Sequence, residues 1–347
     1  MRFALTAEQI DFAASLRKMG EAAKTPGVVR AWGAGDAAAG RALLGQLAEA
    51  GALGLTITEE NGGFGAGPVE LIVAFTEIGR AAVPGPLVET AAAIPALLQA
   101  LPDSALAARW LPELAEGAKL GTIALATSAG SSAGEAAGVP LALDADVADL
   151  VLVADGDRVS VATAGAQVKS VDAARRLFPV HAGDVLAEGE GVREAIEKAF
   201  DTAALAAAAQ LLGAGRALLD TSVDYVKQRQ QFGKPIGQYQ SIKHHLANVS
   251  IGLEMAQPLL YRAALTLQDD ADPVTRARDI SAAKLACGGA AYTAARIALQ
   301  VHGAIGYTAE FDLSLWLTKV TALRSAWGTP DVHRTRIAAA LREGVTA

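Results

Sequence analysis

The spacing of apolar residues changes twice along this chain of 347 residues, and these changes constrain its fold more than any other feature. Up to about residue 120, and again from about residue 192, apolar residues recur mostly three, four or seven positions apart, as in amphipathic helices. Between these regions, short β-type runs alternate with Gly, Asp and Ser. The sequence therefore predicts a mostly α-helical fold with a small central β domain, divided into residues 1–120, 121–190 and 191–347.

The expected elements follow from this pattern. In the first segment, helices are expected near residues 6–19, 37–50, 68–80, 88–100 and 107–115. In the second, strands are expected at residues 122–125, 150–154, 159–163 and 167–171, with a hairpin turn at Asp155-Gly156-Asp157. In the third, a helical pattern runs to about residue 341, with helices expected over 201–227, 240–267 and 278–301.

Composition excludes several classes of function. A net charge of −7 and a pI near 5.3 argue against a nucleic-acid partner. The single cysteine, Cys287, excludes an internal disulfide and argues against a cysteine-based metal site. The N-terminus has no apolar stretch followed by a cleavage site, so a cytoplasmic location is expected. The most apolar window, residues 203–219, contains Gln210 and Arg216 and is interpreted as too short and too polar for membrane insertion.

One polar segment joins two long helical patterns and carries candidate binding chemistry. It reads Arg229-Gln-Gln-Phe232-Gly233-Lys-Pro235-Ile236-Gly-Gln-Tyr239-Gln240, and we call residues 229–240 the arginine loop. Pro235 prevents a helix from continuing, and Gly233 lets the chain turn. The segment is either a polar turn between antiparallel helices or a site for a phosphate-bearing ligand, since a guanidinium group matches phosphate oxygens.

A second motif follows about seventy residues later, at Gln300-Val-His302-Gly303-Ala304-Ile-Gly306-Tyr307. By itself His302 indicates a helix-terminal histidine rather than a catalytic base. An earlier glycine-rich loop, Glu59-Glu60-Asn-Gly62-Gly63-Phe-Gly65, is not followed by Lys-Ser/Thr, which excludes a P-loop.

These motifs together resemble the acyl-CoA dehydrogenase family, and the order of predicted domains agrees over nearly the whole chain. The resemblance implies an N-terminal helical domain, a β-barrel-like middle domain and a C-terminal four-helix bundle. The resemblance implies an FAD enzyme that removes a proton α, and a hydride β, to the carbonyl of an acyl-CoA thioester. In this family the two loops of one subunit reach the FAD of a neighbour. The cofactor-binding positions that this implies are Arg229, Phe232, Tyr239, Gln240, Gln300, Gly303, Ala304 and Thr329.

The chain departs from the family where the catalytic carboxylate is expected. The usual Glu lies in a Tyr-Glu-Gly-Thr segment, and the matching segment is Ala326-Trp327-Gly328-Thr329. The indole of Trp327 cannot accept a proton. The alternative position on the helix before the arginine loop is Ala203. The flavin-binding segment of the β domain is also altered at residues 126–134, and a Trp-Ile-Thr strand has no counterpart.

The expected function is therefore a base-lacking subunit of a heteromeric acyl-CoA dehydrogenase that completes the FAD site of a homologous partner. A turn at Val83-Pro-Gly-Pro-Leu87 is similar to that of members acting on steroid side-chain thioesters, and the resemblance also implies an electron-transfer flavoprotein as partner. Three alternatives remain open. The first is a self-sufficient homo-oligomer with a relocated base at Asp201 or Asp331. The second is a non-catalytic scaffold, and the third is an enzyme of different flavin chemistry.

Overall fold

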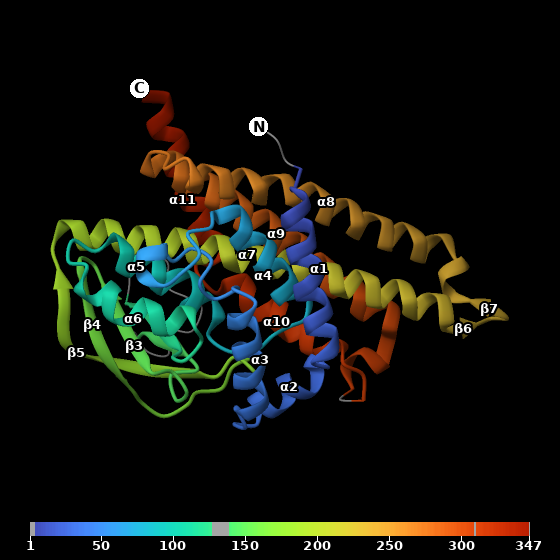
Figure 1. Cartoon of the computed structure of the whole chain (residues 1–347). Coiled ribbons are helices and arrows are strands. Elements are labelled where there is room, and N and C mark those ends of the chain that lie inside the picture. Colours follow the sequence, from blue (N-terminus) through green and yellow to red (C-terminus); the bar gives the residue numbers. More distant parts are fainter. Residues whose placement is uncertain (1–3, 127–138, 309, 347) are drawn as a thin grey trace.

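Three segments of the chain pack around one long helix, α7 (Glu190–Gln228), which crosses the molecule (Figure 1). The computed structural model describes residues 4–126, 139–308 and 310–346, without side-chain detail at residues 344–346. Helix α7 contacts helices of both the N-terminal and the C-terminal segment. The mostly α-helical fold with a small sheet, predicted from the sequence, is confirmed.

The N-terminal segment lies against one side of α7. Its helices are α1 (Ala7–Ala22), α2 (Thr25–Gly33), α3 (Ala38–Glu49), α4 (Pro68–Arg80), α5 (Ile94–Ala100) and α6 (Ala105–Ala115), with short helical turns η1 (Glu59–Asn61) and η2 (Glu89–Ala93). Thr6 begins α1 by a capping box, since its hydroxyl accepts from the Gln9 backbone and the Gln9 side chain accepts from the Thr6 backbone. The sequence missed only α2, which begins after Lys24 in a left-handed conformation.

The central sheet has the strand order β1-β3-β4-β5-β2. Its strands are β1 (Gly121–Ala126), β2 (Leu141–Leu143), β3 (Leu150–Asp155), β4 (Arg158–Ala164) and β5 (Leu177–Glu188). β1 and β3 are parallel and the remaining pairs are antiparallel. The hairpin at Gly156 is confirmed, but the strand expected at 167–171 is wrong, because only a single bridge joins Val168 to Leu177. The sequence missed β2 and also β5, whose residues 181–185 are exposed and show no alternation. The domain limits at 120/121 and 190/191 fall beside the start of β1 and just inside α7, and they stay predictions.

The C-terminal segment forms the bundle. It contains α7, α8 (Gln240–Gln268), α9 (Pro273–His302), η4 (Gly303–Tyr307), α10 (Leu313–Ser325) and α11 (Pro330–Thr346). The interpretation that the apolar window of α7 is too short and polar to cross a membrane was wrong, since the 39-residue helix passes that test by length and composition. Its most apolar stretch is 83% buried inside the structure, which is typical of the core helix of a soluble protein.

Helices α4 and α7 touch through backbone atoms at two glycines. A Cβ atom on Gly213 would lie 1.8 Å from the carbonyl oxygen of Thr76, and one on Gly79 would lie 2.1 Å from the carbonyl oxygen of Gln210. Only glycine permits this approach. The contact fixes the N-terminal segment against the bundle. Cys287 on α9 is fully buried, as expected for a core residue.

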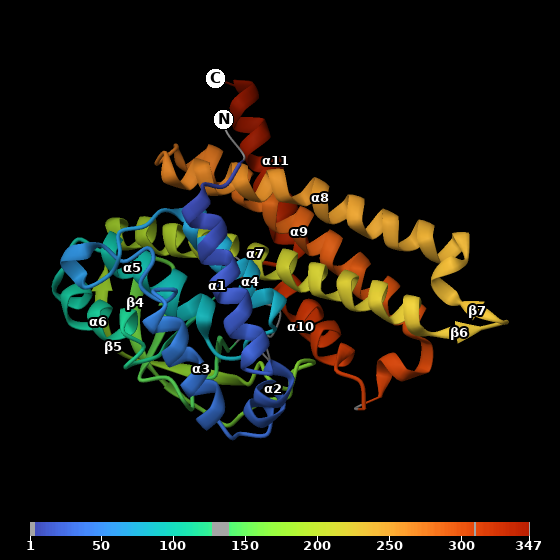
Figure 2. The same ribbon diagram turned by 45° about the vertical axis from the view of Figure 1, so that its right-hand side comes forward.

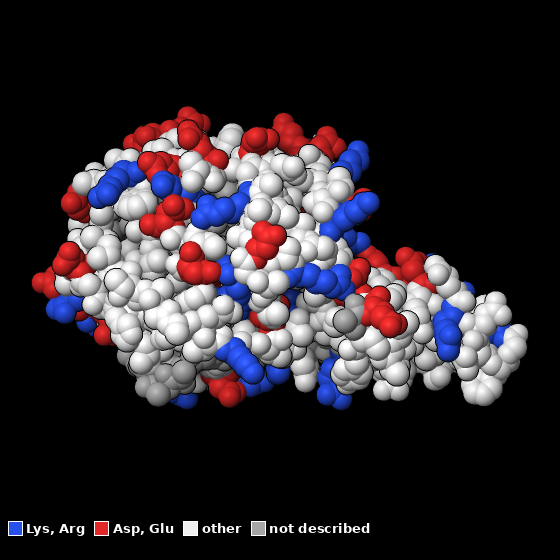
Figure 3. Space-filling view, turned by 90° about the horizontal axis from the view of Figure 1, so that it is seen from below, with Lys and Arg blue, Asp and Glu red and all other residues white. Residues whose placement is uncertain are grey.

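The ends of α7 and α8 extend beyond the body of the molecule as a narrow arm that carries a small hairpin (Figures 1 and 2). The hairpin consists of β6 (Gln230–Gln231) and β7 (Lys234–Pro235), followed by η3 (Ile236–Gln238). The space-filling view in Figure 3 shows the same arm, and basic and acidic side chains lie interspersed over that face. The sheet lies at the opposite end of α7 from the hairpin.

Candidate functional site

The arginine loop forms the tip of the arm. Its two short strands pair antiparallel across a two-residue turn at Phe232 and Gly233. These residues have φ angles of +53° and +79°, as the tight turns that suit β-hairpins require. Glycine adopts such an angle without strain, which explains the Gly in this position.

The loop presents its side chains to solvent. Arg229 and Gln240 are exposed, and Phe232 is 91% exposed. Tyr239 is half-buried, with its ring 4.3 Å from the Lys234 ammonium. Burying the Phe232 ring against a partner would stabilise an assembly by about 2 kcal/mol. The single chain offers a guanidinium and a phenyl ring that its own fold leaves uncovered.

The second loop lies at the same end of the bundle. Helix α9 ends at His302, and Gly303 follows with a φ of +64°. The side chain of Gln300 and residues Gly303 and Ala304 are exposed. The two loops are joined through the interior, because the ring of Tyr225 on α7 stacks on that of His302 with centroids 4.2 Å apart. The structure therefore brings seven of the eight predicted cofactor-binding positions to one end of the molecule.

His302 itself supports the loops from within. Its Nδ1 lies 2.7 Å from the carbonyl oxygen of Ala298 and therefore donates to it. The ring is buried between Tyr225 and Phe311, and burial lowers its pKa. A neutral, stacked imidazole holds the end of α9 in place, in agreement with the interpretation of a helix-terminal histidine.

The eighth position, Thr329, lies elsewhere. It is half-buried, and its hydroxyl accepts from the backbone of Val332 at 3.3 Å at the start of α11. Its neighbour Trp327 packs on Phe200 of α7, with ring centroids 6.4 Å apart. Since twenty-nine residues of α7 separate Phe200 from Arg229, the two places are about 40 Å apart along the helix. One chain does not bring its arginine loop to its own Trp327.

Trp327 is the residue at which the sequence resemblance implies the family's carboxylate. It is 6% exposed and has a φ of +53°, and Gly328 follows at +100°. The indole Nε1 donates to Oε1 of Glu89 at 3.1 Å. The other position, Ala203, is fully buried on α7. Neither residue can take up a proton.

The backbone around Trp327 is held by buried polar groups. Nε2 of His333 donates to the carbonyl oxygen of Trp327 at 3.0 Å, so its Nδ1 accepts from the hydroxyl of Ser281 at 3.1 Å. Burial lowers the pKa of His333 to about 3, so the ring stays neutral. The ammonium of Lys284 donates to the carbonyl oxygens of Leu323 and Arg324 at the end of α10. This turn has little freedom to move.

Glu89 is a functional candidate that the sequence reasoning missed. It lies in η2, is 3% exposed, and its Oε2 has no hydrogen-bond partner among the described residues. Burial raises the pKa of its carboxyl group, against the opposing influence of the Arg175 guanidinium. One signal was present in the sequence, because Glu89 is the one charged residue in the apolar stretch 87–100.

A buried lysine anchors the turn before Glu89. The ammonium of Lys319 on α10 donates to the carbonyl oxygens of Val83 and Ala82 at 2.6 and 3.3 Å. Burial lowers its pKa to about 8. Lys319 thus connects α10 to the turn at residues 83–87 and helps to fix the position of η2 relative to α10.

The two aspartates considered as relocated bases are placed differently. Asp201 is 1% exposed and accepts from Arg276 at 2.8 Å and from Arg336 at 2.6 Å. Both carboxylate oxygens of Asp201 are therefore engaged by guanidinium groups of this chain. The side chain of Asp331 is 90% exposed and pairs with Arg334. Neither geometry favours proton abstraction from a bound thioester.

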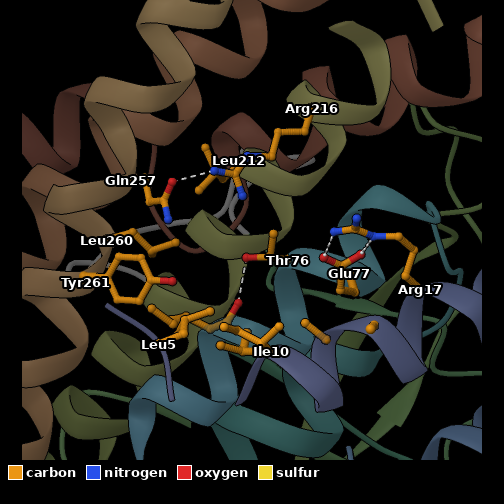
Figure 4. A pocket seen from close by; sticks show the side chains of 14 residues that line it. Leu5, Ile10, Arg17, Thr76, Glu77, Leu212, Arg216, Gln257, Leu260 and Tyr261 are labelled. Carbon is orange, nitrogen blue, oxygen red and sulfur yellow. Dashed lines mark hydrogen bonds and ion pairs between the residues drawn. The ribbon is translucent and has the colours of Figure 1, made fainter. Parts of the chain in front are cut away.

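Other features lie apart from these residues. Figure 4 shows a cavity of about 280 Å³ between α1, α4, α7 and α8, beside the ion pair of Arg17 with Glu77. No predicted site residue lines it. The altered segment at 126–134 lies outside the described residues except for Ala126. Within the described ranges, no group of three or more His, Cys, Asp or Glu could hold a metal ion.

Comparison with known proteins places these observations in a family. Residues 6–118 match the acyl-CoA dehydrogenase N-terminal domain, and residues 189–342 match the acyl-CoA dehydrogenase C-terminal domain. Acyl-CoA dehydrogenase IpdE2 of Mycobacterium tuberculosis is 32% identical to this chain over 299 residues, which cover 85% of each protein.

Solved structures share the fold. Butyryl-CoA dehydrogenase from Megasphaera elsdenii superposes with a TM-score of 0.84 at 24% identity, over 99% of this chain and 100% of that chain. The Tcur3481-Tcur3483 steroid ACAD superposes with a TM-score of 0.81 at 21% identity, over 98% of this chain and 99% of that chain. At such identities the likeness establishes the fold alone.

Proposed function

The chain belongs to the acyl-CoA dehydrogenase family of oxidoreductases, and from this premise we propose that it is one subunit of an FAD-dependent enzyme that dehydrogenates an acyl-CoA thioester. In this proposal its exposed loops complete the FAD site of a homologous partner subunit. The partner supplies the carboxylate that takes the α-proton, since Ala203 and Trp327 occupy both usual positions here.

The observation that carries the proposal is the position of the arginine loop. Arg229 is exposed, and among the described residues it has no ion-pair partner. It lies about 40 Å along α7 from the part of this chain that contains Trp327. Groups with this chemistry therefore act on a ligand held mainly by another chain.

The residues of the two loops suit a dinucleotide. The guanidinium group of Arg229 matches pyrophosphate oxygens, and Gly303 exposes backbone that a phosphate can approach closely. The ring of Phe232 can cover an aromatic base. When bound, FAD supplies the hydride acceptor. The residues of this chain bind and orient it without contributing a base.

The surface also supports assembly with a second chain. Ile251, Met255 and Leu259 follow one another at four-residue steps along α8, and they are 59%, 70% and 41% exposed. Residues four apart lie on one face of a helix, so these side chains form an apolar stripe. Such a stripe favours a protein partner over water.

The substrate class and further partners belong to the same proposal. The Tcur3481-Tcur3483 enzyme is described as a steroid ACAD, and the turn at residues 83–87 resembles that of steroid side-chain enzymes. We propose a steroid-derived acyl-CoA as substrate, an electron-transfer flavoprotein as the electron acceptor, and a cytoplasmic location.

A self-sufficient enzyme is the second candidate, and one observation favours it. Glu89 is a carboxyl group within hydrogen-bond distance of the residue at the usual base position. If Glu89 takes the α-proton, the chain needs no partner carboxylate. Loss of flavin reduction by acyl-CoA in Glu89→Gln, with unchanged FAD content, would assign this role to Glu89.

Measurement of flavin content tests the main proposal. The chain is purified alone and after co-expression with a homologous acyl-CoA dehydrogenase chain from the same genome. Flavin absorbance is expected to give little FAD for the chain alone and one FAD per pair of chains for the complex. A homo-oligomer with one FAD in every chain would contradict the proposal, and a complex without FAD would favour a scaffold.

A further inference from the structure

We infer that Trp327 and Glu89 close the acyl-binding cleft of this chain, so that it excludes the acyl group while still completing the FAD site of its partner. The inference rests on the proposed function, which places Trp327 where the proton-abstracting carboxylate of the family stands. A carboxylate at that position must touch the α-carbon of a bound acyl group. The side chain found there therefore fills space that the substrate would use.

The indole is built into the core. It is 6% exposed, lies against Phe200, and its N–H is satisfied by Glu89 at 3.1 Å. The buried indole fills this part of the interior, and its N–H would be costly to bury without an acceptor. The contact joins η2 in the N-terminal segment to the turn between α10 and α11.

The backbone holds the ring in this place. Trp327 has a φ of +53°, a conformation that costs a residue with a side chain about 1 kcal/mol. A Cβ atom on Gly328 would lie 2.5 Å from Nε2 of His333, so this turn leaves no room for a larger residue. Hydrogen bonds from His333 and Lys284 offset the strain. The turn therefore directs the indole toward Glu89.

Glu89 acts as the acceptor that secures the ring. Its Oε1 receives the indole N–H, and its Oε2 is enclosed without a partner among the described residues. Because burial raises its pKa, the carboxyl group is favoured in its neutral form, whose carbonyl oxygen still accepts a hydrogen bond. Lys319 fixes the preceding turn, so the acceptor is held at a set distance from Trp327.

With Trp327 and Glu89 in place, the two homologous subunits have different roles. This chain contributes Arg229 and its neighbours to a flavin, while its own cleft is filled by Trp327. The acyl thioester then binds only in the partner. The complex is expected to bind one acyl-CoA per pair of chains.

Binding of free indole to a Trp327→Gly variant tests whether the Trp327 side chain fills a cavity beside Glu89. The measurement needs no flavin, no partner subunit and no activity assay. The variant Trp327→Gly suits the positive φ and leaves a cavity of indole size. We expect its unfolding temperature to fall and added indole to restore it. In this background Glu89→Ala is expected to weaken indole binding about tenfold, whereas Glu89→Gln, which keeps an acceptor oxygen, retains most of it.

Acyl binding tests the consequence in the complex with the partner. A redox-inert thioether analogue of an acyl-CoA is titrated by calorimetry. The wild-type complex is expected to bind one equivalent per pair of chains and the Trp327→Gly complex two. Trp327→Phe, which keeps an apolar ring, should fold and bind one equivalent.

Three results would overturn the inference. The first is two equivalents in the wild type. The second is no additional equivalent in Trp327→Gly although indole restores its stability. The third is loss of flavin reduction by acyl-CoA in Glu89→Gln with unchanged FAD content, which would make Glu89 the base. Failure of the proposed function would appear separately, as FAD content that does not depend on the partner.

Discussion

The indole nitrogen of Trp327 lies 3.1 Å from Oε1 of Glu89, a residue 238 positions earlier in the chain. This hydrogen bond joins η2 in the N-terminal segment to the turn between α10 and α11. At the other end of α7, the arginine loop stands in solvent. The chain thus combines a packed interior at one end with exposed polar and aromatic side chains at the other.

Arg229→Ala is expected to lower the FAD content of the complex. Loss of a charge-assisted contact to phosphate corresponds to about tenfold weaker binding or more. Arg229→Lys keeps the charge but not the planar guanidinium group, so its FAD content should lie between those of the wild type and Arg229→Ala. Lys227→Ala is the matched control, because Lys227 is an exposed cation on the last turn of the same helix. Equal FAD content in Arg229→Ala and Lys227→Ala would refute the role of Arg229.

Phe232→Ser is expected to leave the stability of the isolated chain unchanged and to weaken its association with the partner. The ring is 91% exposed, so the chain alone loses no packing. Sedimentation velocity measures the association. Phe64→Ser changes a ring that is 59% exposed among the N-terminal loops, and it should leave association unaffected. Normal association of the Phe232 variant would count against the hairpin as a contact.

Asp201→Asn is expected to destabilise the fold by about 3 kcal/mol, because it leaves Arg276 and Arg336 without their buried counter-charge. Asp331→Asn, at an exposed position, should leave the midpoint of urea unfolding unchanged. If Asp201→Asn instead kept its stability and lost flavin reduction, or if Asp331→Asn lost flavin reduction, that aspartate would be the base.

Acidification is expected to destabilise the chain through His333. Burial lowers the pKa of its imidazole from 6.5 to about 3, so the unfolded chain binds the proton more tightly between these values. The stability contributed by neutral His333 is present above pH 6.5 and is lost as the pH falls toward 3, by up to about 5 kcal/mol. Urea unfolding of the wild type and of His333→Asn across this range measures it. Parallel pH profiles would contradict the assignment.

Gly213→Ala is expected to destabilise the fold by about 3 kcal/mol, since its Cβ atom would meet the backbone of α4 at 1.8 Å. Gly252→Ala is the control on α8, where no atom lies within 4 Å of the added methyl group. Alanine there should be neutral or slightly stabilising. Thermal unfolding measures the stability of both variants. Similar melting temperatures would show that α4 and α7 can move apart without loss of stability.

Local sequence determined much of the architecture. Apolar spacing gave α4 and α8 nearly to the residue, and Asp155-Gly156-Asp157 gave the β3–β4 hairpin, because these signals act over one or two turns of chain. The apolar pattern did not predict β5, because exposed residues 181–185 do not alternate between apolar and polar. It also predicted a strand over 167–171 that the structure replaces by a single bridge. A strand whose pairing decides its existence has a weak local signal.

Some features of the candidate site also follow from the sequence, and others only from the tertiary structure. The order of residues alone identified the arginine loop, the loop after α9, and the absence of a carboxylate at positions 203 and 327. Only the tertiary structure placed Glu89 against Trp327, and only it separated Trp327 from Arg229 by the length of α7. The physical reason is that helix periodicity and turn chemistry are local, whereas a hydrogen bond between buried side chains depends on how distant helices pack.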